Sequence, residues 1–157
     1  MLRLAKWLAT AGGLGELPFA PGTAGSAAGL LIGLAWRQWT EAWPGSGLLT
    51  LLALAGGLLL GVFVSEITDR QLAAHDPSCI VIDEVLGMWL VIAFCPSLNP
   101  PWLSAAVAFL AFRAFDIAKP PPLKLLARCP GGWGILLDDV GAAVYALGIV
   151  WAVSRLF

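Results

Sequence analysis

Residues 47–64 have the sequence GLLTLLALAGGLLLGVFV, a run of eighteen residues without a charge. An apolar run of about 18 residues or more is long enough to cross the hydrocarbon core of a bilayer as an α-helix. Lipid offers the backbone no hydrogen-bond partners, so a chain crosses it as a helix or as part of a closed barrel. The run at 47–64 therefore predicts a membrane-spanning helix.

The composition of the whole chain is that of a membrane protein. Of 157 residues, 59% are hydrophobic and 12% are charged, and this charged fraction is about half that of an ordinary soluble domain. Nine Lys and Arg with ten Asp and Glu are too few to cover the surface of a soluble protein of this size. The composition also disfavours a disordered chain, a coiled coil and a nucleic-acid partner.

Four further apolar segments accompany the run, and several of them are short or contain acids. Together the five segments are residues 24–39, 47–64, 80–95, 102–112 and 135–153. We expect an all-α fold, a polytopic membrane helical bundle of about four to five spanning or partly spanning helices. The N-terminal MLRLAKWLATAGG is expected to lie at the membrane interface. The length suits one domain, and no repeat or long linker divides residues 1–157.

Glycines inside these segments predict close contacts between helices, because a residue without a side chain lets two backbones approach. The glycines in question are Gly29, Gly33, Gly56, Gly57, Gly61 and Gly87.

Basic residues predict the orientation, since Lys and Arg are retained on the cytoplasmic side of a membrane. The stretch after the fourth segment contains Arg113, Lys119, Lys124 and Arg128, so we expect it inside. If each segment crosses once, the N-terminus and the 65–79 loop are also inside. The predicted topology is multi-pass, with the site facing the cytoplasm.

Eight of the ten acids fall at this same face. They are Glu66, Asp69 and Asp76 in the 65–79 loop, Asp83 and Glu84 one turn into the third helix, Asp116 after the fourth, and Asp138 and Asp139 one turn into the fifth. A charged residue within a spanning segment costs roughly 2.5–3.5 kcal/mol on insertion scales. These acids therefore need partners or a function.

Carboxylates that converge in a low dielectric repel one another unless a cation joins them. An oxygen-rich cluster almost without histidine suits Mg²⁺. The candidate metal ligands are Asp83, Asp138 and Asp139, with Glu66 and Glu84 as further ones. Two alternatives remain open: helix-end salt bridges with Arg113 and Lys119, and acids stabilising helix N-termini.

Two stretches suit a phosphate group. Arg113, Asp116 and Lys119 are spaced by three residues, which places them on one helical stripe if the helix continues, and a guanidinium grips phosphate with two parallel hydrogen bonds. The alternative is the ordinary basic flank of a spanning helix. In PGTAGS at 21–26, Thr23 and Ser26 offer hydroxyls near a helix start, which suits either a phosphate cradle or a Pro-Gly turn with a helix cap.

At these residues the sequence resembles the phosphatidylglycerophosphatase A family. The resemblance rests on four blocks in the family's order: PGTAGS at 21–26, DPSCIVIDEVLGMW at 76–89, FRAFDIAKPPPL at 112–123 and GGWGILLDDVGA at 131–142. It implies a Mg²⁺-dependent enzyme of the bacterial inner membrane. Such an enzyme takes phosphatidylglycerophosphate from the bilayer and removes its terminal phosphate, which leaves phosphatidylglycerol and inorganic phosphate in phospholipid biosynthesis.

The resemblance carries the family's polar residues onto this chain position by position. They match here as Thr23, Ser26, Glu66, Asp69, Asp76, Asp83, Glu84, Arg113, Asp116, Lys119, Asp138 and Asp139. We expect the acids to hold one or two Mg²⁺ or to act as a general base. Arg113 and Lys119 are expected to neutralise the phosphoryl group, and Thr23 and Ser26 to orient it.

Two other functions remain as alternatives. One is a different Mg²⁺-dependent phospholipid phosphotransferase, of the class called CDP-alcohol phosphotransferases. The chain lacks that group's signature, since no two Asp residues are spaced by four here. The other is a small cation transporter lined by carboxylates, which would distribute its acids across the bilayer rather than at one face. The pattern makes no prediction of oligomeric state.

Overall fold

The computed structural model describes residues 2–72 and 78–156, and every regular element in this part of the chain is helical. The elements are α1 (Leu2–Ala9), the 3₁₀ turn η1 (Leu14–Glu16), α2 (Pro21–Thr40), α3 (Ser46–Leu72), α4 (Ile82–Phe94), α5 (Pro101–Ala118), α6 (Leu123–Leu126) and α7 (Gly132–Val153). The five apolar segments form α2, α3, α4, α5 and α7 in turn. The predicted all-α fold is confirmed.

Several helices extend beyond their apolar segments, which corrects the predicted places of some acids. Glu66 and Asp69 lie on α3, which continues to Leu72, and not in a loop. Asp116 lies on the last turn of α5 and not after it. Polar residues support these extensions, as in the ion pair of Glu66 and Arg70 at 2.6 Å, four residues apart.

Three helices among the described residues are long and apolar enough to cross a bilayer, namely α3, α5 and α7. Helix α4 has 13 residues and is about 20 Å long, shorter than the roughly 30 Å hydrocarbon core. Its neighbours enclose it, since Met88 and Val91 are fully buried. The fold is therefore a membrane bundle in which spanning helices surround a short internal one.

Helix α2 packs along α4 through glycines spaced by four residues. Gly29 lies against the backbone of Val85, where a Cβ would come within 2.9 Å of the Val85 Cα, and Gly33 lies against Ile92. The close contacts predicted from these glycines are confirmed. Gly56 is an exception, because a Cβ there would meet no atom within 4 Å.

The largest buried cluster joins α4, α5 and α7. Phe112 of α5 is completely buried beside Gly87 of α4, and Ala142 and Ala146 of α7 pack on the same cluster. Small residues on α7 and α4 let these helices approach closely. This packing fixes the rotation of α4, α5 and α7 about their axes, and therefore the direction of their acidic side chains.

Helix α1 is a separate short helix on the side of α3. Ala5 and Ala9 pack against Val64, while Leu2 and Trp7 on the other side are 61% and 58% exposed. The N-terminal segment expected at the membrane interface therefore forms a helix with one packed and one exposed apolar face.

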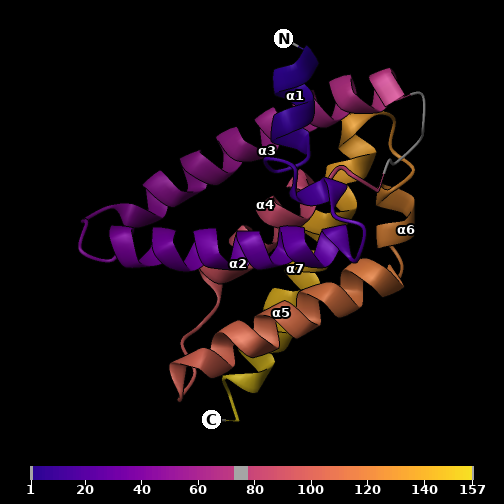
Figure 1. The fold of residues 1–157 in the computed structure, drawn as a ribbon. Helices are drawn as coiled ribbons and strands as arrows, with labels where there is room; N and C mark the ends of the chain where they lie inside the picture. The colour runs from indigo at the N-terminus through magenta and orange to yellow at the C-terminus, as the bar shows by residue number, and fades with distance from the viewer. Residues whose placement is uncertain (1, 73–77, 157) are drawn as a thin grey trace.

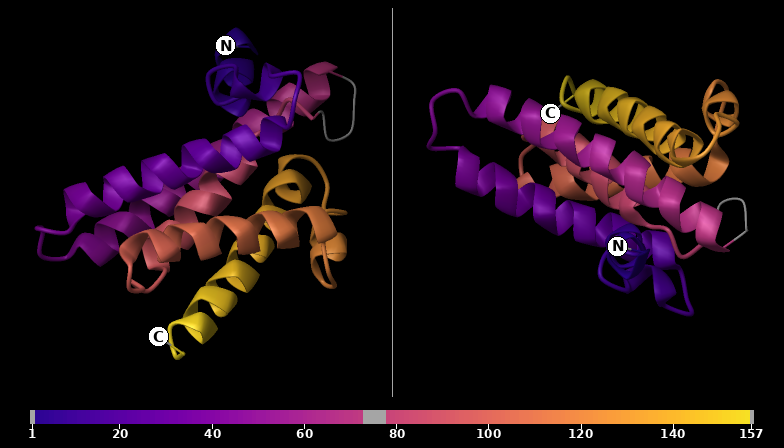
Figure 2. Two further views of the ribbon diagram at one scale, coloured as in Figure 1. Left: turned by 60° about the horizontal axis from the view of Figure 1, so that its bottom comes forward. Right: turned by 90° about the horizontal axis from the view of Figure 1, so that it is seen from above.

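Successive long helices reverse direction, so alternate ends meet at one end of the bundle. Figure 1 shows the start of α2, the end of α3, the end of α5 and the short α6 together at its right-hand side. The connection between α2 and α3 lies at the opposite end, as both views of Figure 2 also show. The acids of α3, α4, α5 and α7 are in this way brought to one end.

Candidate active site

A cavity of about 760 Å³ opens where these helix ends meet. Its size is that of a small-molecule site. Its charged lining consists of six acids and three basic residues: Asp69, Asp83, Glu84, Asp116, Asp138 and Asp139 with Arg113, Lys119 and Arg128. The cavity has more acidic than basic residues, and it lies between apolar helices where charges are poorly solvated. A bound cation would therefore stabilise this arrangement of carboxylates.

Three carboxylates form the centre of the cavity. One oxygen each from Asp83, Glu84 and Asp139 lies within 4.8 Å of the other two. Asp83 and Glu84 belong to the first turn of α4, and Asp139 lies two turns into α7. In the described part of the chain, a buried oxygen of each has no hydrogen-bond partner, namely Asp83 Oδ1, Glu84 Oε2 and Asp139 Oδ2. These converging hard oxygen donors fit Mg²⁺.

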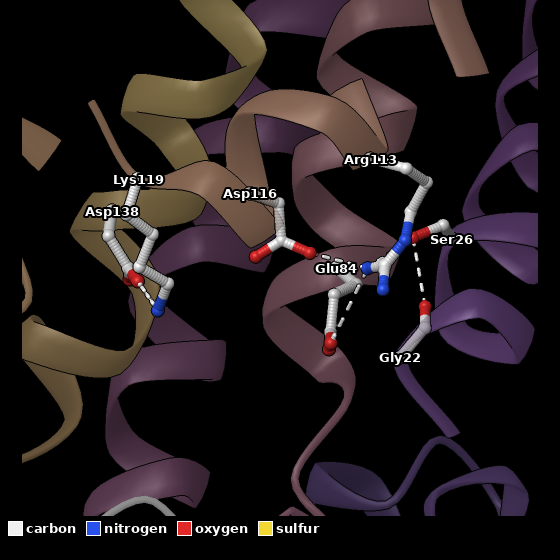
Figure 3. A network of polar contacts seen from close by, with 7 residues as sticks. All are labelled: Gly22, Ser26, Glu84, Arg113, Asp116, Lys119 and Asp138. Carbon is white, nitrogen blue, oxygen red and sulfur yellow. Dashed lines mark hydrogen bonds and ion pairs between the residues drawn. The ribbon is translucent and has the colours of Figure 1, made fainter. Parts of the chain in front are cut away.

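Arg113 connects this centre to the neighbouring helices. Its Nη1 donates to Asp116 Oδ2 at 2.5 Å and to Ser26 Oγ at 3.3 Å, and it lies 3.9 Å from Glu84 Oε1. Figure 3 shows these contacts converging on one guanidinium. The side chain is 16% exposed, so three elements hold Arg113 at the cavity wall.

Lys119 and Asp138 form a second ion pair beside the centre. Lys119 ends α5 in a left-handed conformation with φ 43°, and its Nζ donates to Asp138 Oδ2 (Figure 3). Asp138 is 3% exposed. Asp138 therefore pairs with Lys119 and, among the described residues, lies outside the group of three carboxylates. This is the salt bridge that the sequence left open as an alternative.

The PGTAGS stretch is the first part of α2. The residue before the helix is Ala20, which makes no side-chain cap, so the interpretation of Thr23 and Ser26 as helix caps is wrong. Ser26 Oγ instead donates to Gly22 O at 2.9 Å and accepts from Arg113. Thr23 is exposed and lines the cavity.

Glu66 lies apart from the cavity lining. Its Oε2 accepts a hydrogen bond from the backbone N–H of Gly132 at 2.6 Å. The bond ties the end of α3 to the start of α7, where Gly131 has a φ of 61° that favours glycine. In this structure Glu66 positions α7, although the sequence suggested it as a metal ligand.

The structure brings most of the predicted site residues together. Those that line the cavity are Thr23, Asp69, Asp83, Glu84, Arg113, Asp116, Lys119, Asp138 and Asp139. Ser26 contacts it through Arg113, whereas Asp76 lies outside the described residues.

Sequence reasoning missed two contributors to this site. Gly22 touches the Glu84 carboxylate, since a Cβ on Gly22 would overlap it. Arg128 lines the cavity, but from the sequence it was considered only as a basic residue that indicates the membrane orientation. Two features of the sequence could have indicated these contributors, namely the Pro-Gly pair at 21–22 and the basic residue Arg128 just before the glycines at 131–132.

The model of the phosphatidylglycerophosphatase A family matches residues 7–154. The chain belongs to this family. It is 38% identical to phosphatidylglycerophosphatase A of Haemophilus influenzae over 94% of this chain and 86% of that protein. It is 33% identical to the Escherichia coli protein of the same name over 94% and 82% of the two chains.

A further relative has a different name. A protein of Bacteroides thetaiotaomicron, a putative phosphatidylinositol-3-phosphatase, is 34% identical over 94% of this chain and 91% of its own. No solved structure matches the chain. The resemblance to the phosphatidylglycerophosphatase A family is confirmed, and so, at the level of the family, is the prediction of a phosphatase enzyme.

Proposed function

We propose that this protein is a Mg²⁺-dependent lipid phosphatase of the bacterial inner membrane. Its substrate is phosphatidylglycerophosphate, from which it releases inorganic phosphate and leaves phosphatidylglycerol, a step of phospholipid biosynthesis. The observation that carries the proposal is the group of three carboxylates with unpartnered buried oxygens, adjacent to Arg113. The relatives named phosphatidylglycerophosphatase A support the choice of lipid.

Asp83, Glu84 and Asp139 are the residues that would hold the metal. Their oxygens already converge, and no described side chain neutralises all three. Mg²⁺ bound there would offset the charge that develops on the phosphoryl oxygens during hydrolysis.

The basic residues position the phosphate. Arg113 has a buried Nε without a partner and lies at the edge of the three carboxylates, so its guanidinium can donate to a phosphoryl oxygen. Lys119 adds a further positive charge to the cavity lining, and the exposed Thr23 adds a hydroxyl. Ser26 holds Arg113 in place.

Hydrolysis breaks the bond between phosphorus and the glycerol oxygen, which takes up a proton from the solvent, and forms a bond between phosphorus and a water oxygen, which gives up a proton. A carboxylate outside the metal group is needed to accept the water proton. Asp116 lines the cavity and is held by Arg113, so we assign it this general-base role.

The lipid reaches the cavity from the cytoplasmic leaflet in this proposal. Arg70, Arg113, Lys119 and Arg128 lie at the cavity end of the bundle, which is the distribution of a cytoplasmic end. Ile117 lines the cavity while being 73% exposed. It therefore offers an apolar surface beside the polar site, as an anchored lipid requires.

A cation transporter fits this arrangement less well. The acids that line the cavity lie on the last turns of α3 and α5 and the first two turns of α4 and α7. An ion pathway needs polar groups along the membrane depth, whereas these acids form one terminal cluster.

The decisive experiment measures phosphate release by the purified protein in detergent. Phosphatidylglycerophosphate is compared with phosphatidic acid, phosphatidylinositol-3-phosphate and a soluble phosphomonoester, each with Mg²⁺ and with EDTA. We expect Mg²⁺-dependent release, fastest from phosphatidylglycerophosphate. Faster release from phosphatidylinositol-3-phosphate would reassign the substrate to that of the Bacteroides relative's name. No release from any of the four by folded protein would overturn the proposed function.

A further inference from the structure

Arg128 differs from the other basic residues of the cavity. Arg113 is paired with Asp116, and Lys119 with Asp138. Arg128 lines the same cavity and is exposed, yet no carboxylate in residues 2–72 and 78–156 lies within ion-pair distance of it. Its charge therefore remains available to a ligand.

The backbone around Arg128 is held in place. Its N–H donates to Leu125 O at 3.1 Å, and the N–H of Cys129 donates to Leu126 O at 3.0 Å. The loop also lies close on the first turn of α7, because a Cβ at Gly134 would come within 3.0 Å of Ala127 O. The backbone of Arg128 is thus held at a fixed point of the cavity lining, and its side chain is exposed.

We propose that Arg128 binds the internal phosphodiester of the lipid substrate, an inference that rests on the proposed function. Phosphatidylglycerophosphate carries a terminal phosphomonoester and, nearer the acyl chains, a phosphodiester. In the proposed function, the metal held by the three carboxylates and the Arg113 guanidinium bind the terminal phosphomonoester. The second is also anionic and needs a cation at the rim, where a guanidinium donates two parallel hydrogen bonds to its free oxygens. Arg128 is then a specificity residue for substrates that carry a phosphodiester as well as the terminal phosphate.

The test compares Arg128→Gln with Lys124→Gln and the wild type in detergent micelles. Lys124 is an exposed basic residue on α6 that does not line the cavity, so its variant controls for loss of charge. For Arg128→Gln we expect the KM for phosphatidylglycerophosphate to rise about tenfold while kcat stays within about twofold. The inhibition constant of phosphatidylglycerol, which has only the diester, should rise by a similar factor. That of inorganic phosphate should not change, and Lys124→Gln should alter none of these constants.

Two results would overturn the inference. One is an unchanged KM and an unchanged inhibition constant for phosphatidylglycerol in Arg128→Gln. The other is a parallel loss of kcat and of phosphate inhibition, which would place Arg128 at the terminal phosphate instead. Direct binding of phosphatidylglycerol to the wild type and to Arg128→Gln separates this inference from the proposed function. If the wild type binds it about tenfold more tightly yet releases no phosphate from phosphatidylglycerophosphate, the diester site stands and the proposed reaction fails.

Discussion

The carboxylate of Glu84 on α4 occupies the space into which a side chain at Gly22 of α2 would project. The atom nearest to this space is the end of a side chain and not backbone. The two helices can therefore stay in place while the carboxylate is displaced. Arg113 Nη1 borders the same space, 3.3 Å from the place of such a Cβ and 3.9 Å from Glu84 Oε1. Gly22 thus determines where one of the three central carboxylates lies.

The substitution Gly22→Ala should lower phosphatase activity by about tenfold to 100-fold, because small displacements of a catalytic group are costly. The melting temperature should change little. Gly56→Ala is the matched control, since Gly56 is also helical and a Cβ there meets nothing within 4 Å. Activity and thermal unfolding of both variants check the prediction. Equal activities of the two variants would contradict the close packing at Gly22.

The substitutions Asp83→Asn and Asp139→Asn should each reduce turnover by at least about 100-fold, because each removes a charged donor from the proposed metal site. Both variants should fold, since the amide has the size of the carboxylate and relieves charge repulsion. Glu41→Gln, on an exposed residue between α2 and α3, serves as the control. Phosphate release at increasing Mg²⁺ concentrations is the measurement, and near-normal activity in both aspartate variants would refute the site.

The Lys119–Asp138 pair should appear as an energetic coupling. Asp138 is almost fully buried, so Lys119→Met leaves a charge without its partner and destabilises the protein. Asp138→Asn in the same chain should recover part of that loss. A double-mutant cycle on the free energy of unfolding should give a coupling of about 1–3 kcal/mol. A coupling near zero would show that the two side chains contribute independently.

Glu66 should contribute to activity by holding α7 in position and not by taking part in the chemical step. Glu66→Gln keeps an oxygen that can accept from the Gly132 N–H, so its activity should remain within about threefold of the wild type. Glu66→Ala loses this bond and should lower the free energy of unfolding by about 1–2 kcal/mol. If Glu66→Gln lost activity as strongly as Asp83→Asn, Glu66 would have to be assigned to the metal after all.

The one-ended arrangement of the acids could be predicted from the sequence. It follows from the alternation of apolar segments, which sends every second connection to the same side. The ends of the helices could not be predicted in this way, since hydropathy detects only the apolar part. Glu66 and Asp116 therefore moved from expected loops onto α3 and α5.

The sequence also could not predict which member of each acidic pair joins the central group of carboxylates. Asp83-Glu84 and Asp138-Asp139 look alike as neighbouring acids. In the structure both members of the first pair join the central group, but only Asp139 of the second does. The difference depends on the rotation of α7 against α4 and α5, which the packing of Phe112 against Gly87 and the alanines of α7 decides. Such contacts between distant segments leave no local pattern.

The exposed Ile117 at the edge of the cavity has a consequence for kinetics. In the proposed function, a lipid that approaches past this apolar residue at the end of α5 does not leave its leaflet to be hydrolysed. Encounters are then two-dimensional, and the rate depends on the mole fraction of substrate in the membrane rather than on its bulk concentration. Dilution with inert lipid or detergent at constant total substrate should slow such an enzyme, whereas addition of buffer should leave its rate per molecule unchanged.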